Sequence, residues 1–211
     1  MPPMSHPRPF RFGIQLHTAP DGPSWAASAR KAEDLGFSTL FLPDHFGDQL
    51  APIPALMAAA DATTTLRVGS LVFDNDYKHP LVLAKELATI DRLSGGRLEV
   101  GLGAGWMATD YEESGIPMDS PGVRVSRMVE GIEVIKGCFG PGPFSFKGEH
   151  YTITEHDAQP SRCSRHRRSS SGEAPSACCR SRAGKRRSSA STRRSTAAVS
   201  TPPPPRTAPP M

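Results

Sequence analysis

Residues 66–106 read LRVGSLVFDNDYKHPLVLAKELATIDRLSGGRLEVGLGAGW and contain one complete strand–helix–strand pattern. Residues 66–73 form an apolar run, residues 81–93 place apolar side chains at helical spacing, and residues 98–102 form a second apolar run. The Ser-Gly-Gly triplet at 94–96 is a helix stop signal. Strands that alternate with helices of this length are typical of βα units on a parallel sheet. This stretch therefore predicts an α/β fold.

The same alternation continues on both sides of this stretch. Four predicted strands each precede a predicted helix: residues 10–16 and 24–35, 39–42 and 53–62, 66–73 and 81–93, and 98–102 and 123–138. Residues 144–146 and 151–153 flank the sequence KGEH and predict a hairpin outside this repeat. The pattern thus predicts about four βα units in sequential order.

Residues 161–211 differ in composition from the rest of the chain. They include no Leu, Ile, Phe, Tyr or Trp, and they hold twelve Lys and Arg side chains against one acid, Glu173. A segment this poor in large apolar groups cannot bury enough surface to offset its ordering entropy. We therefore expect one domain over residues 10–160, with a disordered N-terminus at 1–9 and a disordered, Arg/Ser/Pro-rich tail.

Several sequence features bear on compartment and metal binding. No apolar run is long enough to suggest a membrane span, and residues 1–9 (MPPMSHPRP) are too polar for a signal peptide. Cys138 is the single cysteine before the tail, which fits a reducing compartment. The cysteines lack metal-site spacing, and His150 and His156 have no partner cluster. We expect a cytoplasmic protein without a metal site.

Three segments near the predicted strand ends resemble the bacterial luciferase-like family. They are residues 41–46 (FLPDHF), the Lys78-His79-Pro80 turn, and residues 93–106 (LSGGRLEVGLGAGW). Within that family, residues 74–80 (DNDYKHP) are most similar to oxidoreductases that use the 8-hydroxy-5-deazaflavin coenzyme F420. The resemblance covers about Phe10 to Gln159. It implies a TIM-type (β/α)8 barrel, here incomplete, whose site lies at the carboxyl ends of the strands.

The resemblance implies hydride transfer between the deazaflavin coenzyme and a small organic substrate that the sequence does not identify. An FMN-dependent monooxygenase of the same fold is the alternative, and the sequence does not separate the two. Asp44 and His45 occupy positions where the family contacts the ring and the substrate, and an imidazole can donate a hydrogen bond or shuttle a proton near neutral pH. Taken without the resemblance, Asp44 is a cap for the following segment and His45 a polar residue at the barrel rim.

The resemblance also implies a wall for the coenzyme ring. Relatives have a bulge with a non-prolyl cis peptide there, and the matching position falls at about Leu71-Val72; an ordinary buried strand is the alternative. Ala104 and Gly105 follow the fourth strand and offer backbone N–H groups for close approach of the coenzyme. A tight turn explains these two residues equally well. Tyr77 and its neighbours are expected to contact an anionic substrate or to form a solvated loop.

The basic tail has two interpretations. Its Arg and Lys side chains could neutralise nucleic-acid phosphates, but it lacks interleaved aromatic residues, so no specific nucleic-acid partner is expected. We favour a one-nucleotide frameshift near Gln159-Pro160. With synonymous codons, residues 160–191 can be reread in the shifted frame as an apolar P-I-L-V strand, a Gly-rich turn and an amphipathic helix. We therefore expect a truncated barrel with impaired activity, and a homo-oligomer only for the full-length form.

Overall fold

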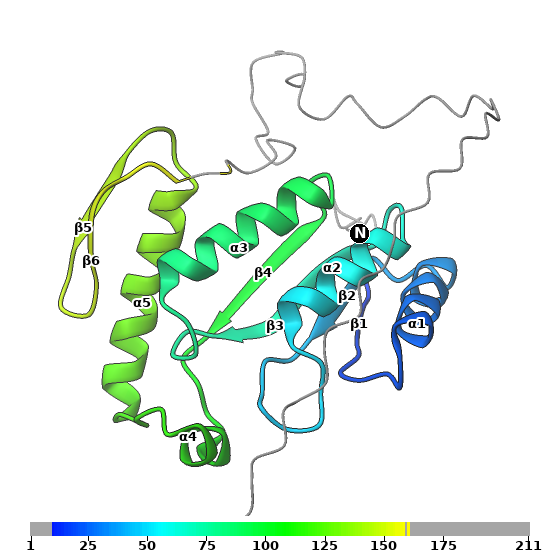
Figure 1. The fold of residues 1–211 in the computed structure, drawn as a ribbon, viewed down its shortest axis with the longest axis horizontal. Coiled ribbons are helices and arrows are strands. Elements are labelled where there is room, and N and C mark those ends of the chain that lie inside the picture. The colour runs from blue at the N-terminus through cyan, green and yellow to red at the C-terminus, as the bar shows by residue number, and fades with distance from the viewer. Residues whose placement is uncertain (1–9, 159, 161–211) are drawn as a thin grey trace, which may run out of the picture. The chain divides into compact units, whose positions relative to one another are not determined.

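A computed structural model of the chain describes residues 10–158 and residue 160 (Figure 1). The elements follow in the order β1 (Gly13–Gln15), α1 (Gly22–Asp34), β2 (Thr39–Leu42), α2 (Pro52–Ala62), β3 (Arg67–Asp74), α3 (Pro80–Leu93), β4 (Leu98–Gly103), α4 (Ala108–Ser114), α5 (Pro121–Cys138), β5 (Phe144–Lys147) and β6 (Thr152–His156). The predicted βα units and the hairpin are therefore confirmed. The expected disorder at both ends and the frameshift hypothesis concern residues outside the described ones.

The four strands of the main sheet lie in sequential order, β1-β2-β3-β4, and every pairing is parallel. The hairpin strands β5 and β6 form a separate antiparallel pair, as expected. The register of β3 against β4 shifts between Ser70 and Phe73, where the Leu71-Val72 peptide is cis. The predicted position of this bulge is confirmed. Because the strands are parallel, all of their carboxyl ends lie at one edge of the sheet.

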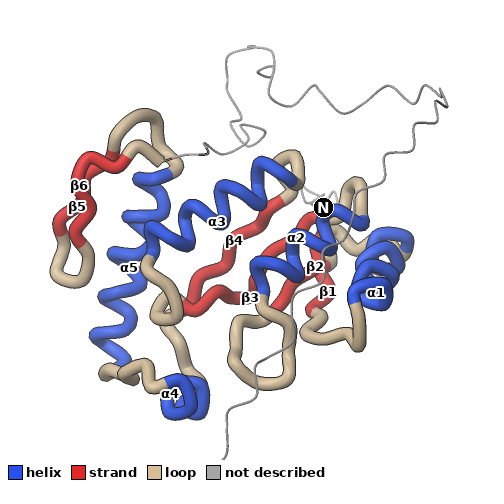
Figure 2. The backbone as a smooth tube through the Cα atoms, in the orientation of Figure 1, coloured by secondary structure: helices blue, strands red, loops and turns tan. Residues whose placement is uncertain are grey.

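Helices pack on one face of the sheet and bury its core. Consecutive helices contact each other, with α1 against α2, α2 against α3, and α3 against α5. Figure 2 shows α2 and α3 running along the same face of the strands. The strands supply alternate buried side chains such as Leu40 and Leu42, and α1 supplies Trp25, Ala29 and Ala32 at helical spacing. The apolar periodicity of the sequence thus becomes the helix–sheet core.

On the opposite face of the sheet, glycines make room for larger neighbours. A Cβ atom added to Gly13 would lie 2.6 Å from Cε2 of Phe41. On β4, a Cβ atom on Gly101 or Gly103 would lie 3.0 or 2.5 Å from a methyl group of Val72. Phe41 and Val72 therefore pack directly against glycine backbone on this face. A larger residue in place of these glycines would prevent that packing.

Helix α4 was not predicted from the sequence. Its sequence, ATDYEES, has no large aliphatic side chain and no apolar periodicity. It ends at Gly115, which has φ of 74° in the left-handed region that glycine adopts at helix ends. The helix nevertheless buries Asp110 and Tyr111. It therefore adds two polar side chains to the carboxyl edge of the sheet.

None of the helices in residues 10–158 combines the length and the hydropathy that crossing a membrane requires.

Candidate active site

A backbone-to-carboxylate hydrogen bond joins the carboxyl ends of β2 and β3. The backbone N–H of Asp74 donates to Oδ2 of Asp44 over 3.2 Å, and the N–H of Asp76 donates to Oδ1 of Asp74 over 2.8 Å. Asp44 does not cap α2, because the N-cap position of that helix is Ala51. Asp44 instead links two strand ends, and it brings three carboxyl groups to one edge.

His45 contacts the buried carboxylate of Asp110 on α4. Nδ1 of His45 lies 2.7 Å from Oδ2 of Asp110, and the Tyr77 hydroxyl donates to the same oxygen over 2.8 Å. The side chain of Asp110 is 4% exposed and that of His45 is 23% exposed. Burial by itself would raise the pKa of Asp110, but the hydrogen bonds from His45, Tyr77 and the backbone of Phe46 hold that pKa below its ordinary value. Asp110 is therefore ionised at neutral pH.

A second network attaches α5 to the same edge. Asp76, whose side chain is 1% exposed, accepts hydrogen bonds from the Tyr111 hydroxyl and from Nη1 of Arg127, each over 3.0 Å. Arg127 also pairs with Asp119. Arg124 donates from Nε to the carbonyl of Ala104 over 3.1 Å. These contacts hold the segments after β3 and β4 against one helix.

Gly105 is required by the packing of this edge. It has φ of 75°, and a Cβ atom at this position would lie 1.8 Å from the Tyr111 hydroxyl oxygen and 2.8 Å from Oδ2 of Asp74. Any larger residue would displace Tyr111 from Asp76. Gly105 thus has a structural role, and the coenzyme contact expected of Ala104 and Gly105 stays a prediction.

Burial gives the acids of this edge unusual pKa values. It raises the pKa of Asp44, although the N–H of Asp74 and the charge of Lys78 oppose the shift. It also raises the pKa of Asp74 to about 6, with added repulsion from Asp76 and Asp44. Burial and hydrogen bonding to Asp110 raise the pKa of Tyr77 as well. Asp74 therefore titrates close to the physiological range, while the phenol of Tyr77 keeps its proton.

A pocket opens between the segments that follow β2 and β3. It has a volume of about 180 Å³ and is open to solvent. Its wall combines apolar and polar groups, among them Asp44, His45, Phe46, Ile53, Phe73 and Tyr77. Few polar groups on an otherwise apolar wall are typical of small-molecule sites. The pocket therefore marks this edge as the candidate active site.

The structure brings Asp44, His45, Ala104 and Gly105 to this one edge, after the ends of β2 and β4, whereas Leu71 and Val72 lie within β3 and do not line the pocket. Asp44 is bonded to Asp74, Val72 lies two residues before Asp74, and the position of Gly105 borders the Asp74 carboxyl group. The sequence analysis missed Asp110 and Tyr111, for which the available signal was an Asp-Tyr pair shortly after the fourth strand. Tyr77 was expected to be a substrate contact or part of a solvated loop, but its hydroxyl binds Asp110 and its ring lies 4.4 Å from that of Phe46.

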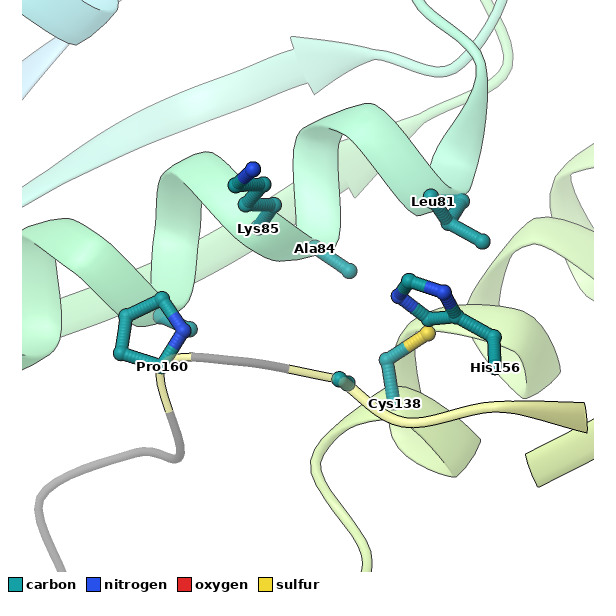
Figure 3. A pocket seen from close by; sticks show the side chains of 8 residues that line it. Leu81, Ala84, Lys85, Cys138, His156 and Pro160 are labelled. Atoms are coloured by element: carbon teal, nitrogen blue, oxygen red, sulfur yellow. The ribbon is translucent and has the colours of Figure 1, made fainter. Parts of the chain in front are cut away.

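A second, smaller pocket lies between α3, the end of α5 and β6 (Figure 3). Lys85, Cys138 and His156 contribute to its wall. Burial raises the pKa of the Cys138 thiol, which keeps it in its less reactive protonated form. Among the residues that the structure describes, no group of His, Cys, Asp and Glu side chains could hold a metal ion. The residues of this smaller pocket are therefore not part of the candidate active site at the carboxyl ends of the strands.

Comparison with known sequences identifies the family. Residues 5–167 match the sequence model of the luciferase-like monooxygenases. The chain belongs to the luciferase-like monooxygenase family. This luciferase-like protein is 29% identical over 168 residues to an F420-dependent glucose-6-phosphate dehydrogenase of Nakamurella multipartita, a match that covers 73% of the chain and 49% of the relative. It is 32% identical over 126 residues to an FMNH(2)-dependent dimethylsulfone monooxygenase of Pseudomonas putida, with coverage of 60% and 34%.

A solved structure supports the same assignment. The coenzyme F420-dependent tetrahydromethanopterin reductase of Methanopyrus kandleri superimposes with a TM-score of 0.66 at 26% identity, covering 72% of this luciferase-like protein and 46% of the reductase. The chain spans about half the length of the curated relatives it matches. Its four βα units correspond to part of the TIM-type barrel of its relatives, which confirms the predicted fold class. The family consists of oxidoreductases and monooxygenases.

Proposed function

We propose that this luciferase-like protein is an oxidoreductase that transfers hydride between the deazaflavin coenzyme F420 and a small organic substrate. The observation that carries the proposal is the exposed apolar bulge at Leu71-Val72 beside the polar edge of Asp44 and His45. Leu71 is 53% exposed and Val72 is 37% exposed. Its likeness to F420-dependent relatives supports the choice of coenzyme.

The residues at the bulge fit one face of a planar ring. Val72 lies against Gly101 and Gly103 on β4. Because these two residues have no side chains, neither of them covers Val72. A tricyclic ring laid on this apolar surface would cover the two exposed side chains of the bulge. When bound there, the coenzyme would supply the hydride chemistry, while the protein would hold and orient it.

The polar residues have separate tasks in this proposal. His45 in the pocket wall would exchange hydrogen bonds or a proton with the substrate. Asp44 would hold the β2 and β3 ends in register beside the ring through its bond to Asp74. Several carboxyl groups lie at this edge, so the anionic tail of the coenzyme would point away from Asp74 and Asp76 because like charges repel.

FMN-dependent oxygenation is the second candidate. The observation in its favour is the likeness to an FMNH(2)-dependent monooxygenase at 32% identity. The apolar wall at Leu71-Val72 would serve an isoalloxazine ring as well as a deazaflavin ring, because both are planar tricycles. The coenzyme must therefore be decided by binding measurements.

Parallel fluorescence titrations with coenzyme F420 and with FMN test the proposal. We expect weak binding or none by the 211-residue chain, and saturable binding of F420 in preference to FMN by a version translated in the shifted frame after Gln159. In that version Val72→Glu should weaken binding at least about tenfold, roughly 1.4 kcal/mol, because a charge would enter the apolar wall. The variant Glu112→Gln, at an exposed position on α4, is the matched control. Preferential FMN binding would favour the second candidate, and no effect of Val72→Glu would remove the bulge from the site.

The frameshift hypothesis makes a prediction about the affinity of the protein for its coenzyme. TIM-barrel enzymes often grip phosphate with the loops after their last two strands. We propose that a version translated in the shifted frame after Gln159 binds the coenzyme more tightly than the 211-residue chain. Equal affinities of the two proteins would contradict the hypothesis, and resequencing of the locus would test it independently.

A further inference from the structure

We infer that Asp110 is a positioning residue for His45: it holds the imidazole as the Nδ1–H tautomer and leaves Nε2 as a hydrogen-bond acceptor toward a ligand in the pocket. The use of that acceptor in catalysis rests on the proposed function. The tautomer itself does not, because it follows from contacts within the chain. The two ideas can therefore fail separately.

Three hydrogen-bond partners converge on the carboxylate of Asp110. Oδ2 accepts from the Tyr77 hydroxyl over 2.8 Å, Oδ1 accepts from the backbone N–H of Phe46 over 3.4 Å, and Nδ1 of His45 lies 2.7 Å from Oδ2. An ionised carboxylate has no proton to give. The hydrogen between Asp110 and His45 must therefore belong to Nδ1. The lowered pKa of Asp110 agrees with this assignment, since burial would otherwise raise it.

The backbone of His45 is also held by hydrogen bonds. Nε2 of the Gln49 side chain donates to the carbonyl of His45 over 2.8 Å and to that of Pro43 over 3.3 Å. The ring of Trp106 meets the imidazole edge-on, with 5.7 Å between centroids. The side chain and backbone of His45 are therefore both held, and the ring cannot turn without breaking its bond to Asp110.

The other ring nitrogen of His45 is Nε2. Within residues 10–158, Nδ1 is the ring nitrogen of His45 for which the structure shows a hydrogen-bond partner. Nε2 lies on the opposite edge of the ring, and His45 belongs to the pocket wall with 23% of its side chain exposed. A neutral imidazole that donates from Nδ1 must accept at Nε2. A ligand in the pocket that reaches Nε2 would therefore meet a hydrogen-bond acceptor there.

The test is nitrogen-15 NMR of His45 in the coenzyme-free 211-residue chain. Long-range proton–nitrogen spectra distinguish protonated from unprotonated ring nitrogens, and the signals are assigned by their loss in His45→Gln. Spectra are followed upward in pH until the shifts become constant. We expect a protonated Nδ1 and an unprotonated Nε2. A dominant Nε2–H form in the unaltered chain would overturn the inference without any variant.

Two variants separate positioning from general structural support. Asp110→Ala should lose the Nδ1–H signal and shift His45 to mainly the Nε2–H form. Asp76→Asn is the matched control, because Asp76 is equally buried but bonds to Tyr111 and Arg127. It should leave the His45 shifts unchanged. Equal changes in both folded variants would contradict the inference. If the Nδ1–H form is found and neither F420 nor FMN binds the version translated in the shifted frame after Gln159, the positioning stands and the proposed function fails.

Discussion

Asp44 and Asp74 lie thirty residues apart in the chain, and the backbone N–H of Asp74 donates to Oδ2 of Asp44 over 3.2 Å. The contact joins the ends of two adjacent strands at the edge that holds the candidate site. It also brings together two carboxyl groups whose pKa values burial raises. The edge thus combines a fixed geometry with acids that resist ionisation.

The raised pKa of Asp74 predicts a particular dependence of stability on pH. Asp74 has an ordinary value of 3.8 and a folded-state pKa of about 6, chiefly because of burial. Between these values the unfolded chain releases the proton that the folded chain retains, so the free energy of unfolding falls as pH rises from about 4 to 6. Asp74→Asn should remove this fall and add on the order of 1 kcal/mol at pH 7, after a discount for partial solvent screening.

Urea denaturation of the unaltered chain and of Asp74→Asn at several pH values between 4 and 7 measures this difference. Asp48→Asn, at an exposed position near the site, serves as the control and should follow the unaltered chain. Parallel curves for the unaltered chain and Asp74→Asn would show that Asp74 ionises normally.

Glu33 predicts a pH dependence of the opposite sign. Burial alone would raise its pKa, but the backbone N–H groups of Thr65, Leu66 and Thr64 donate to it, and its pKa falls to about 2. This stabilisation is present above the ordinary value of 4.5 and is lost as pH falls toward 2. Glu33→Gln should cost about 1–2 kcal/mol at pH 7, because the bonds lose their charged acceptor.

Thermal or urea unfolding at pH 7 and pH 3 tests the role of Glu33. The cost of Glu33→Gln should shrink at the lower pH, since at pH 3 the unfolded chain has taken up a proton at Glu33 that the folded chain still lacks. Glu112→Gln on α4 is exposed and should be neutral at both values. A cost for Glu33→Gln that does not change with pH would contradict the assigned charge effect.

Gly103 offers a test of the apolar wall. A Cβ atom there would lie 2.5 Å from Cγ2 of Val72, so Gly103→Ala should displace Val72 and weaken binding of the preferred coenzyme about tenfold, or 1.4 kcal/mol. Gly122→Ala is the matched control because an added Cβ atom meets nothing within 4 Å. Fluorescence titration of both variants gives the comparison. Equal affinities would mean that Val72 does not contact the ring.

Gly105 and Gly115 form a pair that separates steric overlap from backbone conformation. Both have positive φ, 75° and 74°, but a Cβ atom meets the Tyr111 hydroxyl oxygen at 1.8 Å only in the first case. Gly115→Ala should cost about 1–2 kcal/mol from the left-handed conformation. Gly105→Ala should cost about 2–4 kcal/mol because it also displaces a buried hydrogen-bonded side chain. Urea unfolding measures both, and equal costs would exclude the steric contribution.

The order and type of most elements could be read from local patterns. Residues 81–93 place apolar side chains at helical spacing, and α3 spans Pro80–Leu93. The run at 66–73 lies within β3 apart from its first residue, and glycines mark the ends of α3 and α4 with positive φ. These features depend on neighbours a few residues away, so the chain encodes them locally. The bulge at Leu71-Val72 had no such local signal and was located through the family resemblance.

The side-chain partners at the site were decided by tertiary structure. Asp44 and His45 could be proposed from a short motif, but the bond from His45 to Asp110 joins residues 65 positions apart. It exists because the parallel strands bring the segments after β2 and β4 to one edge. There the short helix α4 places Asp110 beside the imidazole of His45. A seven-residue helix without apolar periodicity leaves no pattern from which that contact could be predicted. Its position comes from packing against Tyr77, Asp76 and Arg124, whose contacts with Asp110 and Tyr111 form only when the strand ends and α5 meet.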